Sequence, residues 1–279
     1  MILFKRLELA ARGKTKEVWL TDQRGFALFV STDNLTSGDG AKHNTIPGKG
    51  VLANLTTCNV FRFLSSCEIP TSYVKQIDDT SFFGQLCDMI PYEVVVRREA
   101  YGSYLKAYPK LVKGHLFQQP VVQFFLKTSG KTWEGMEIPV DDPLAIFDKD
   151  GQMHLYRPDQ EIANQEPFSV LGNYPLKHSP KTLSKIKEIA LETFLALEKA
   201  WQQVNGDWRL IDLKIEFGVN RYGLLLLADV IDSDSWRVLS RDGEHLDKQS
   251  YRDGAGLDVV LEKYKIAAKL TETFKAPLL

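Results

Sequence analysis

The segment at residues 211–218 (IDLKIEFG) limits the fold of this chain more than any other. Because side chains alternate between the two faces of a strand, Asp212, Lys214 and Glu216 fall on one face and apolar side chains on the other. A turn-forming NRYG sequence follows, and the run LLLLA at residues 224–228 is apolar on both faces, which is typical of a buried strand. The two segments therefore predict a hairpin that carries charged side chains into an apolar setting.

The charged face of this hairpin has two interpretations. In the expected register Lys214 lies opposite Asp229, and Glu216 lies diagonally from Asp229. Diagonal neighbours are ~7–8 Å apart, close enough for two carboxylates to share a divalent cation, and Mg²⁺ prefers oxygen ligands with positions left for phosphate. The alternative is a solvated face with ordinary cross-strand ion pairs. The residues alone leave both open, although buried charges require partners or a ligand.

Two further segments offer phosphate-binding chemistry. Residues 13–18 (GKTKEV) place Lys14 and Lys16 two positions apart, where their ammonium groups repel unless an anion such as a nucleotide phosphate lies between them. The sequence has no P-loop pattern. Residues 229–237 (DVIDSDSWR) add carboxylates, hydroxyls and Arg237, whose planar fork suits phosphate. Each segment alone also fits an ordinary surface turn.

A third segment combines a strand with a polar turn. Residues 91–97 (PYEVVVR) predict a strand that delivers Arg97, and a Gly-Ser turn at Ser103 follows, which together suit a phosphate. Arg97 fits an ion pair with Glu93 equally well. The glycine-rich loop at residues 33–42 (DNLTSGDGAK) frees the backbone to approach a ligand, with a surface hairpin as the competing interpretation.

Composition narrows the class of protein. The 279 residues include 35 Lys and Arg against 36 Asp and Glu, a net charge of −1, which argues against a general nucleic-acid binder. No apolar run approaches the ~20 residues needed to cross a bilayer, and the first residues lack the pattern of a signal peptide. The three cysteines form no disulfide or metal-binding pattern, which favours a reduced, cytoplasmic compartment.

Hydrophobic periodicity predicts strands and helices mixed without βαβ regularity, and hence the α+β class. Residues 128–180 are expected to be mostly loop, with a short hairpin around Gly151. Strands are expected at residues 17–21, 26–31, 73–77, 92–97, 121–126, 209–217 and 224–231, and helices at residues 51–64, 180–204 and 257–274.

The chain contains eight short motifs in this order: GKTKEV (13–18), SGDGA (37–41), GKG (48–50), IPYEVVVR (90–97), GS (102–103), DLKIEFG (212–218), LADVIDSDSWR (227–237) and DKQSYRD (247–253). Each is weak alone, but together they resemble the SAICAR synthetase family (phosphoribosylaminoimidazole-succinocarboxamide synthases). Several are most similar to the synthetase domain of the animal bifunctional enzyme, and we expect no room here for the carboxylase domain of that enzyme.

The resemblance implies a two-lobed α+β fold with an ATP cleft between a β-rich N-terminal lobe (residues 1–89) and a larger C-terminal lobe (residues 90–279) that binds substrates and metal. It implies an ATP-dependent ligase of purine biosynthesis that joins L-aspartate to the carboxylate of the ribotide CAIR. ATP with Mg²⁺ first phosphorylates that carboxylate, and the aspartate amine then displaces phosphate to give SAICAR. The implied partners are these small molecules, with no nucleic acid or membrane; a homo-oligomer stays open.

The resemblance also implies residue roles. Phosphoryl transfer needs charge neutralisation and placement more than covalent chemistry. Lys214 would steady the transferring phosphoryl group or the substrate carboxylate, and Asp212 would contact the ribotide and act as a base for the amine. The other implied roles are ATP phosphate binding by Lys14 and Lys16, adenine contact near Val18, Cys87 and Met89, Mg²⁺ and ATP binding by Glu216 and Asp229, ribotide phosphate binding by Arg97, Ser103 and Arg237, and a loop bordering aspartate at Asp33, Ser37, Gly38 and Asp39.

The chain departs from the family pattern in one region. After the strand ending at Lys127, the family usually carries a short acidic stretch ending in Asp-Pro, whereas here residues 128–135 intervene and Asp142-Pro143 comes later. Residues 148–179 have no counterpart in the compact bacterial form. The alternative function is therefore an ATP- and Mg²⁺-dependent amide ligase of the same family that acts on a different carboxylate or amine.

Overall fold

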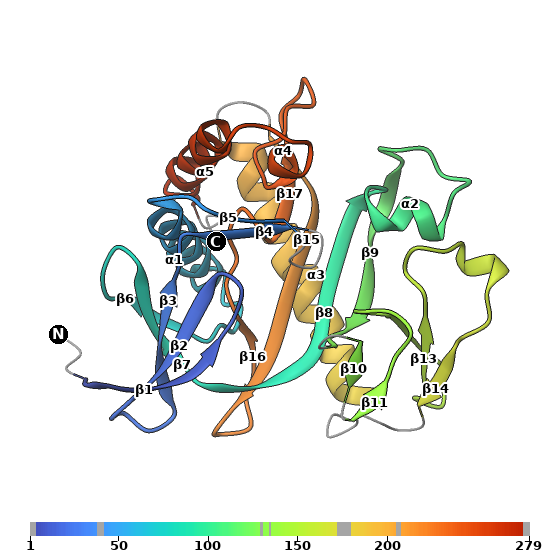
Figure 1. Ribbon diagram of the computed structural model, residues 1–279, viewed down its shortest axis with the longest axis horizontal. Coiled ribbons are helices and arrows are strands. Elements are labelled where there is room, and N and C mark those ends of the chain that lie inside the picture. The colour runs from blue at the N-terminus through green and yellow to red at the C-terminus, as the bar shows by residue number, and fades with distance from the viewer. Residues whose placement is uncertain are drawn as a thin grey trace. The chain divides into compact units, whose positions relative to one another are not determined.

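The computed structural model describes residues 4–37, 42–128, 131–133, 135–171, 180–204 and 208–275, and Figure 1 labels its elements. The chain forms two compact units. The first comprises Met1–Met89, Ala196–Leu210 and Phe217–Leu279, and the second comprises Ile90–Leu195 and Ile211–Glu216. Three elements continue from one unit into the other: strand β8 (Cys87–Glu99), helix α3 (Pro180–Gln203) and strand β15 (Arg209–Asn220).

An antiparallel five-stranded sheet forms much of the first unit. Its strand order is β1-β2-β3-β7-β6, and β2 pairs with β3 so that Val18 lies opposite Phe29. The ring of Phe29 stacks on that of Phe82 at 4.8 Å, and helix α1 (Lys49–Ser66) packs against β3, β6 and β7. The strands are β1 (Arg6–Arg12), β2 (Lys16–Thr21), β3 (Phe26–Ser31), β6 (Tyr73–Gln76) and β7 (Ser81–Gln85).

The remaining elements of the first unit gather around α1. Helix α5 (Leu257–Thr271) lies beside α1, and the Asn59 side chain of α1 donates hydrogen bonds to the Ala268 carbonyl and the Thr271 hydroxyl. These bonds satisfy a buried amide and fix the two helices against each other. The other elements are β4 (Asn34–Ser37), β5 (Lys42–Thr45), β16 (Leu225–Ala228), β17 (Trp236–Leu239) and α4 (Gln249–Arg252).

A second sheet forms the second unit, with the strand order β14-β13-β12-β9-β8-β15. Ile90, Tyr92, Val94 and Val96 of β8 are buried. The Tyr92 ring meets the rings of Phe124 and Phe147 edge-on. Strand β15 also pairs with β16 and β17 of the first unit. The elements not yet given are β9 (Leu116–Leu126), β10 (Thr132–Trp133), β11 (Met136–Glu137), β12 (Leu144–Phe147), β13 (Met153–Tyr156), β14 (Ser169–Leu171), α2 (Ser103–Ala107) and the 3₁₀ helix η1 (Ile162–Asn164).

The α+β class and each strand and helix expected from periodicity are confirmed, and so is the hairpin around Gly151, whose φ of 78° suits a tight turn. The described residues between 128 and 180 lie mostly outside strands and helices, as expected. They also contain the short strands β10 to β14, which the sequence did not predict because strands of two to four residues are too short to carry visible periodicity. One boundary is wrong: the strand expected at residues 224–231 ends at Ala228, since Asp229 adopts a left-handed φ of 63°.

Two further expectations concern compartment. Cys58, Cys67 and Cys87 are all free thiols, as the cysteine pattern predicted. Within the described residues, no helix combines the length and apolar character that a membrane span requires.

Candidate active site

The first unit brings together two of the residues predicted to handle ATP and metal. Lys16 opens strand β2, and Asp229 follows the last residue of β16; their side chains form an ion pair. Lys14 lies in the bend before β2 and is exposed. The positive φ of Asp229 ends the strand and turns its carboxylate toward Lys16. The Lys16 ammonium thus balances the charge of this predicted metal-binding carboxylate.

The predicted adenine contacts also fall in the first unit. Val18 lies in β2, while Cys87 and Met89 lie at the start of β8. A Cβ atom added to Gly218 would lie 2.6 Å from Cys87 Cβ and 3.1 Å from Met89 Sδ, so β15 approaches β8 more closely than any side chain permits. Burial raises the pKa of the Cys87 thiol to about 11, which keeps it protonated near neutrality. Gly218 therefore allows Cys87 and Met89, the two predicted adenine contacts, to lie close against β15.

The second unit holds an arginine-centred cluster. Arg97 of β8 donates from Nε to Gln123 Oε1 at 2.8 Å, from Nη1 to Asp212 Oδ2 at 2.8 Å and from Nη2 to Ser103 Oγ at 3.3 Å. Arg97 is only 3% exposed and Asp212 only 5%. The structure thus brings together three residues predicted to contact the ribotide, and it adds Gln123, which the sequence did not single out.

The Arg97–Glu93 pairing that the sequence left open does not form. Glu93 instead accepts a hydrogen bond from Lys214 Nζ at 2.7 Å. Lys214 also lies 3.8 Å from Glu216, whose other carboxylate oxygen is 2.7 Å from Lys127 Nζ. The charged face of β15 is therefore neutralised by neighbouring side chains rather than by solvent alone.

Electrostatics keeps Lys214 charged. Burial alone would lower the pKa of the Lys214 ammonium, but the carboxylates of Glu93 and Glu216 outweigh burial and raise that pKa above its ordinary value, with a further contribution from Asp142. A lysine that stays cationic can stabilise a transferring phosphoryl group as a point charge.

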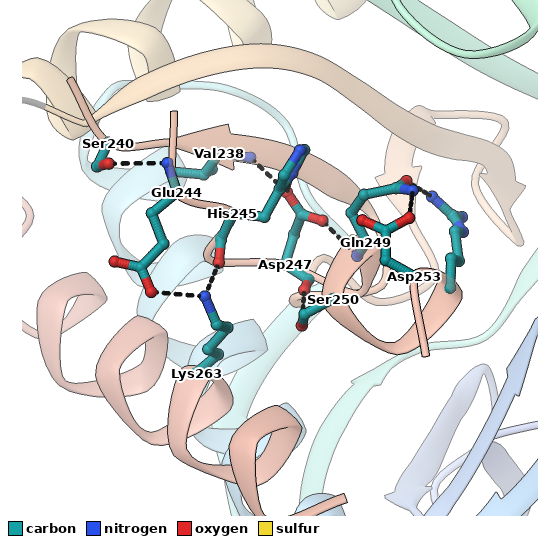
Figure 2. Close-up of polar contacts among 10 residues, drawn as sticks. Val238, Ser240, Glu244, His245, Asp247, Gln249, Ser250, Asp253 and Lys263 are labelled. Carbon is teal, nitrogen blue, oxygen red and sulfur yellow. Dashed lines mark hydrogen bonds and ion pairs between the residues drawn. The ribbon is translucent and has the colours of Figure 1, made fainter. Parts of the chain in front are cut away.

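Arg237 sits on β17, half-buried, in the first unit. The backbone N–H of the next residue, Val238, donates to Asp247 Oδ2 at 3.0 Å, and the same carboxylate accepts from the Gln249 N–H at 2.6 Å (Figure 2). His245 Nδ1 lies 3.1 Å from Asp247 Oδ2. Asp247 is fully buried, so its carboxylate ties β17 to the start of α4 and thereby fixes the backbone that carries Arg237.

Lys49 lies in the GKG motif, but the sequence predicted no role for it. Lys49 is 1% exposed, and its Nζ lies 3.0 Å from Asp234 Oδ2. Asp234 also bonds the Tyr264 hydroxyl and lies 3.7 Å from Lys248. Burial opposes ionisation of Asp234, yet Lys49 and Lys248 hold the pKa of its carboxyl below the ordinary value. The sequence feature that could have identified Lys49 is its position between two glycines.

Asp33 has a structural contact within the loop expected to border aspartate. Its Oδ1 accepts a hydrogen bond from the Gly50 N–H at 2.8 Å, in the first turn of α1. Gly48, the N-cap residue of α1, supplies no side-chain cap, so Asp33 satisfies that helix end from a distant segment. Ser37 ends β4, while Gly38 and Asp39 lie outside the described residues.

The segment that departs from the family pattern begins at Thr128 and ends, at Asp142 and Pro143, beside the same end of β9. Strands β10 and β11 form a small antiparallel hairpin. Beyond it, Asp142 Oδ1 accepts a hydrogen bond from the Thr128 N–H at 2.9 Å, and the Pro143 carbonyl accepts from the Leu126 N–H at 3.0 Å. The Asp-Pro sequence therefore lies against the end of β9 even though fourteen positions separate Thr128 from Asp142.

The predicted metal ligands have suitable chemistry. Glu216 and Asp229 are carboxylates with ammonium partners, so each site already accommodates positive charge. Across the described ranges no group of three or more His, Cys, Asp or Glu side chains is arranged to hold a metal ion. Mg²⁺ commonly uses one or two carboxylates and takes its other ligands from water and phosphate oxygens. Glu216 and Asp229 each have the ligand chemistry that Mg²⁺ takes from proteins.

Comparison with solved structures defines the class of protein. A SAICAR synthetase (Type-2) in complex with ADP matches 98% of this chain and 100% of its own length, with a TM-score of 0.72 and 24% sequence identity. The fold is thus that of SAICAR synthetases.

Sequence comparison identifies the family. The SAICAR synthetase family model matches residues 9–137 and 145–269. A phosphoribosylaminoimidazole-succinocarboxamide synthase of Chloroflexus aurantiacus is 38% identical over 93% of this chain and 94% of its own length. This chain belongs to the SAICAR synthetase family.

Two other relatives are longer than this chain. A probable multifunctional protein ADE2 of Caenorhabditis elegans is 36% identical over 97% of the chain, which spans 59% of that protein. A bifunctional purine synthesis protein of Dictyostelium discoideum is 37% identical over 87% of the chain, which spans 22% of that protein. The similarity to the animal enzyme therefore concerns one part of a larger protein.

Proposed function

We propose that this chain is an ATP-dependent ligase that joins L-aspartate to the carboxylate of CAIR and yields SAICAR, ADP and phosphate. The observation that carries the proposal is the polar face of the second sheet. There Arg97, Asp212 and Ser103 lie beside one another, and Lys214 lies between Glu93 and Glu216. Family membership and the names of the relatives support the same reaction.

The first chemical step places a phosphoryl group on the substrate. A carboxylate oxygen of CAIR attacks the γ-phosphorus of ATP, the bond to the bridging oxygen breaks, and ADP leaves. Lys14 and Lys16 bind the ATP phosphates, and Lys214 steadies the transferring group because its ammonium stays charged. Glu216 and Asp229 would hold Mg²⁺, which supplies positive charge against the phosphate oxygens when bound.

The second step forms the amide. The aspartate amine attacks the acyl carbon, phosphate leaves, and the amine proton passes to the departing phosphate or to water. Asp212 is within reach of the ribotide site, but Arg97 already engages its carboxylate at 2.8 Å. That pairing favours a binding role for Asp212 over the role of base. Ser103, Arg97 and Arg237 bind the ribotide phosphate in this proposal.

The remaining assignments concern the adenine position, the loop beside the aspartate and the cellular compartment. Val18, Cys87 and Met89 would line the adenine position, between the lobes proposed at residues 1–89 and 90–279. The loop from Asp33 to Asp39 would border the aspartate, with Asp33 acting through its bond to α1. A cytoplasmic location, expected from the free cysteines, stays a prediction.

The test is ADP release from ATP and Mg²⁺ with CAIR and L-aspartate supplied together and each omitted in turn. Turnover that needs both, with SAICAR identified by mass, is the expected result. Turnover that responds to neither substrate would instead support the alternative, a same-family ligase for another carboxylate or amine. The bond from the Thr128 N–H to Asp142 supports the standard substrates, because it brings a carboxylate to the end of β9 despite the departure at residues 128–135.

A further inference from the structure

We propose that Gln123 is a positioning residue for ribotide phosphate recognition: it orients the Arg97 guanidinium and, being neutral, leaves that cluster without excess negative charge. The proposal rests on the proposed function of Arg97. It adds a residue of β9 that belongs to none of the eight family-like motifs.

The sheet register brings the two side chains together. Arg97 lies opposite Val121 and Val95 lies opposite Gln123 in the β8–β9 ladder, so Arg97 and Gln123 are diagonal neighbours on one face. Long side chains bridge such a diagonal. The bond from Nε to the Gln123 amide oxygen is 2.8 Å long, and Gln123 is 8% exposed, so water competes little for it.

The Nε contact determines the direction of the guanidinium. A guanidinium is planar, and its N–H groups leave it at fixed angles. With Nε held by Gln123 on one strand and Nη1 held by Asp212 on another, the plane cannot rotate about its long axis. Its third contact, from Nη2 to Ser103, then points at the start of α2. Gln123 thus supplies a second fixed hydrogen bond, which holds the guanidinium plane in a direction that the Asp212 carboxylate alone could not fix.

Charge explains why an amide suits this position. Arg97 and Asp212 contribute one positive and one negative charge, so the pair is neutral. A second carboxylate at position 123 would accept the same Nε hydrogen bond but would leave the cluster with a net negative charge, which repels a phosphate. An apolar side chain would leave the Nε–H without its acceptor in a buried place.

The surroundings of Gln123 make it suitable for substitution. Gln123 is one of the residues that line a cavity of about 460 Å³, together with Tyr108 and Ile146. A side chain of similar volume can replace Gln123 without overpacking the sheet.

The experiment compares Gln123→Met, which removes the acceptor at nearly constant volume, with Gln123→Glu, which keeps the acceptor and adds charge. Gln119→Met is the matched control, because Gln119 is an exposed glutamine of the same strand, β9. Ribose 5-phosphate serves as a binding probe in calorimetry, and the KM values for CAIR and ATP are measured separately.

Both Gln123 variants are expected to bind ribose 5-phosphate and to use CAIR with affinities lowered roughly tenfold or more. The KM for ATP should stay near that of the wild type, a separation that a merely structural role would not give. The melting temperature should fall by only a few degrees, because a single buried interaction changes. Arg97 Nε–H, observed by NMR, should lose its protection from exchange in Gln123→Met and keep it in Gln123→Glu.

Three results would decide against the proposal: unchanged ribose 5-phosphate affinity in both variants, equal losses for CAIR and ATP, or a wild-type protein that binds no ribose 5-phosphate. A wild type that binds the probe, with weakened variants but no SAICAR formation, would support the role of Gln123 and remove the proposed reaction. Failure of the two proposals is thus distinguishable.

Discussion

The Lys214 ammonium lies 2.7 Å from the Glu93 carboxylate, 121 positions away in the sequence. The charge of Lys214 on β15 is therefore balanced by a side chain of the neighbouring strand, β8. Because Glu216 is also within 3.8 Å of Lys214, one cation serves two carboxylates. Such an arrangement releases a carboxylate for metal or substrate without leaving a buried charge unpaired.

Replacing Glu216 with Gln tests the metal and nucleotide assignment. We expect ATP turnover to fall below about a tenth of the wild-type rate, because the amide is a poorer ligand for Mg²⁺. Far-UV circular dichroism should be unchanged. The control is Glu188→Gln, an exposed glutamate of α3 paired with Lys185 at the surface, which should cost almost nothing. Activity retained above that tenth would take Glu216 out of the metal site.

Arg237→Ala should weaken CAIR binding by roughly 1.5–3 kcal/mol through loss of a charge-assisted contact to phosphate. This corresponds to an affinity lower by roughly 10- to 150-fold, to be measured by calorimetry without ATP. Arg241→Ala, at an exposed arginine in the following turn, provides the comparison. Equal affinities for the wild type and Arg237→Ala would mean that the phosphate lies elsewhere.

Gly218→Ala should destabilise the fold by about 1–3 kcal/mol because the new methyl overlaps Cys87. Denaturant unfolding measures this change. The KM for ATP should rise more than that for CAIR, since the displaced residues are the predicted adenine contacts. Gly13→Ala is the control for stability alone, because a methyl group there meets the Lys16 carbonyl oxygen at 3.6 Å and Lys16 Cγ at 3.8 Å, which are ordinary contacts. Unaltered stability would indicate that β8 moves aside freely.

Cys87 should react slowly with iodoacetamide at pH 8. Burial raises its pKa from 9.0 to about 11. Only the thiolate attacks the reagent, so the reactive fraction at pH 8 should be roughly 100-fold below that of an ordinary cysteine. The alkylation rate should therefore increase as the pH rises toward the pKa of Cys87 in the folded protein. Mass spectrometry of each cysteine, with urea-unfolded protein as the reference, measures the rates. Equal folded and unfolded rates would show that Cys87 is not buried.

Local pattern was sufficient for part of the site. Alternation at residues 211–218 predicted which side chains share a face, and their burial follows from the apolar strand behind them. The same reasoning gave the strand that delivers Arg97. These predictions succeeded because the information lies within a single strand.

Contacts between distant segments could not be predicted in this way. Lys49 and Asp234 lie 185 positions apart, and nothing in either segment identifies the partner. Gln123 likewise has no local signal, since a glutamine in an apolar strand acquires meaning only from the register with β8. The position of Asp229 was missed because a left-handed aspartate after a strand leaves no pattern in an apolar run.

The closure between Thr128 and Asp142 has an evolutionary consequence. Because the chain leaves and re-enters the sheet at adjacent points, residues can be added or removed between them at a small entropic cost. The number of residues between Thr128 and Asp142 can therefore change without changing which charged side chains lie at the end of β9. Relatives of this chain can diverge in size there while inheriting an unaltered arrangement of charges, so loop length is a poor guide to what each of them makes.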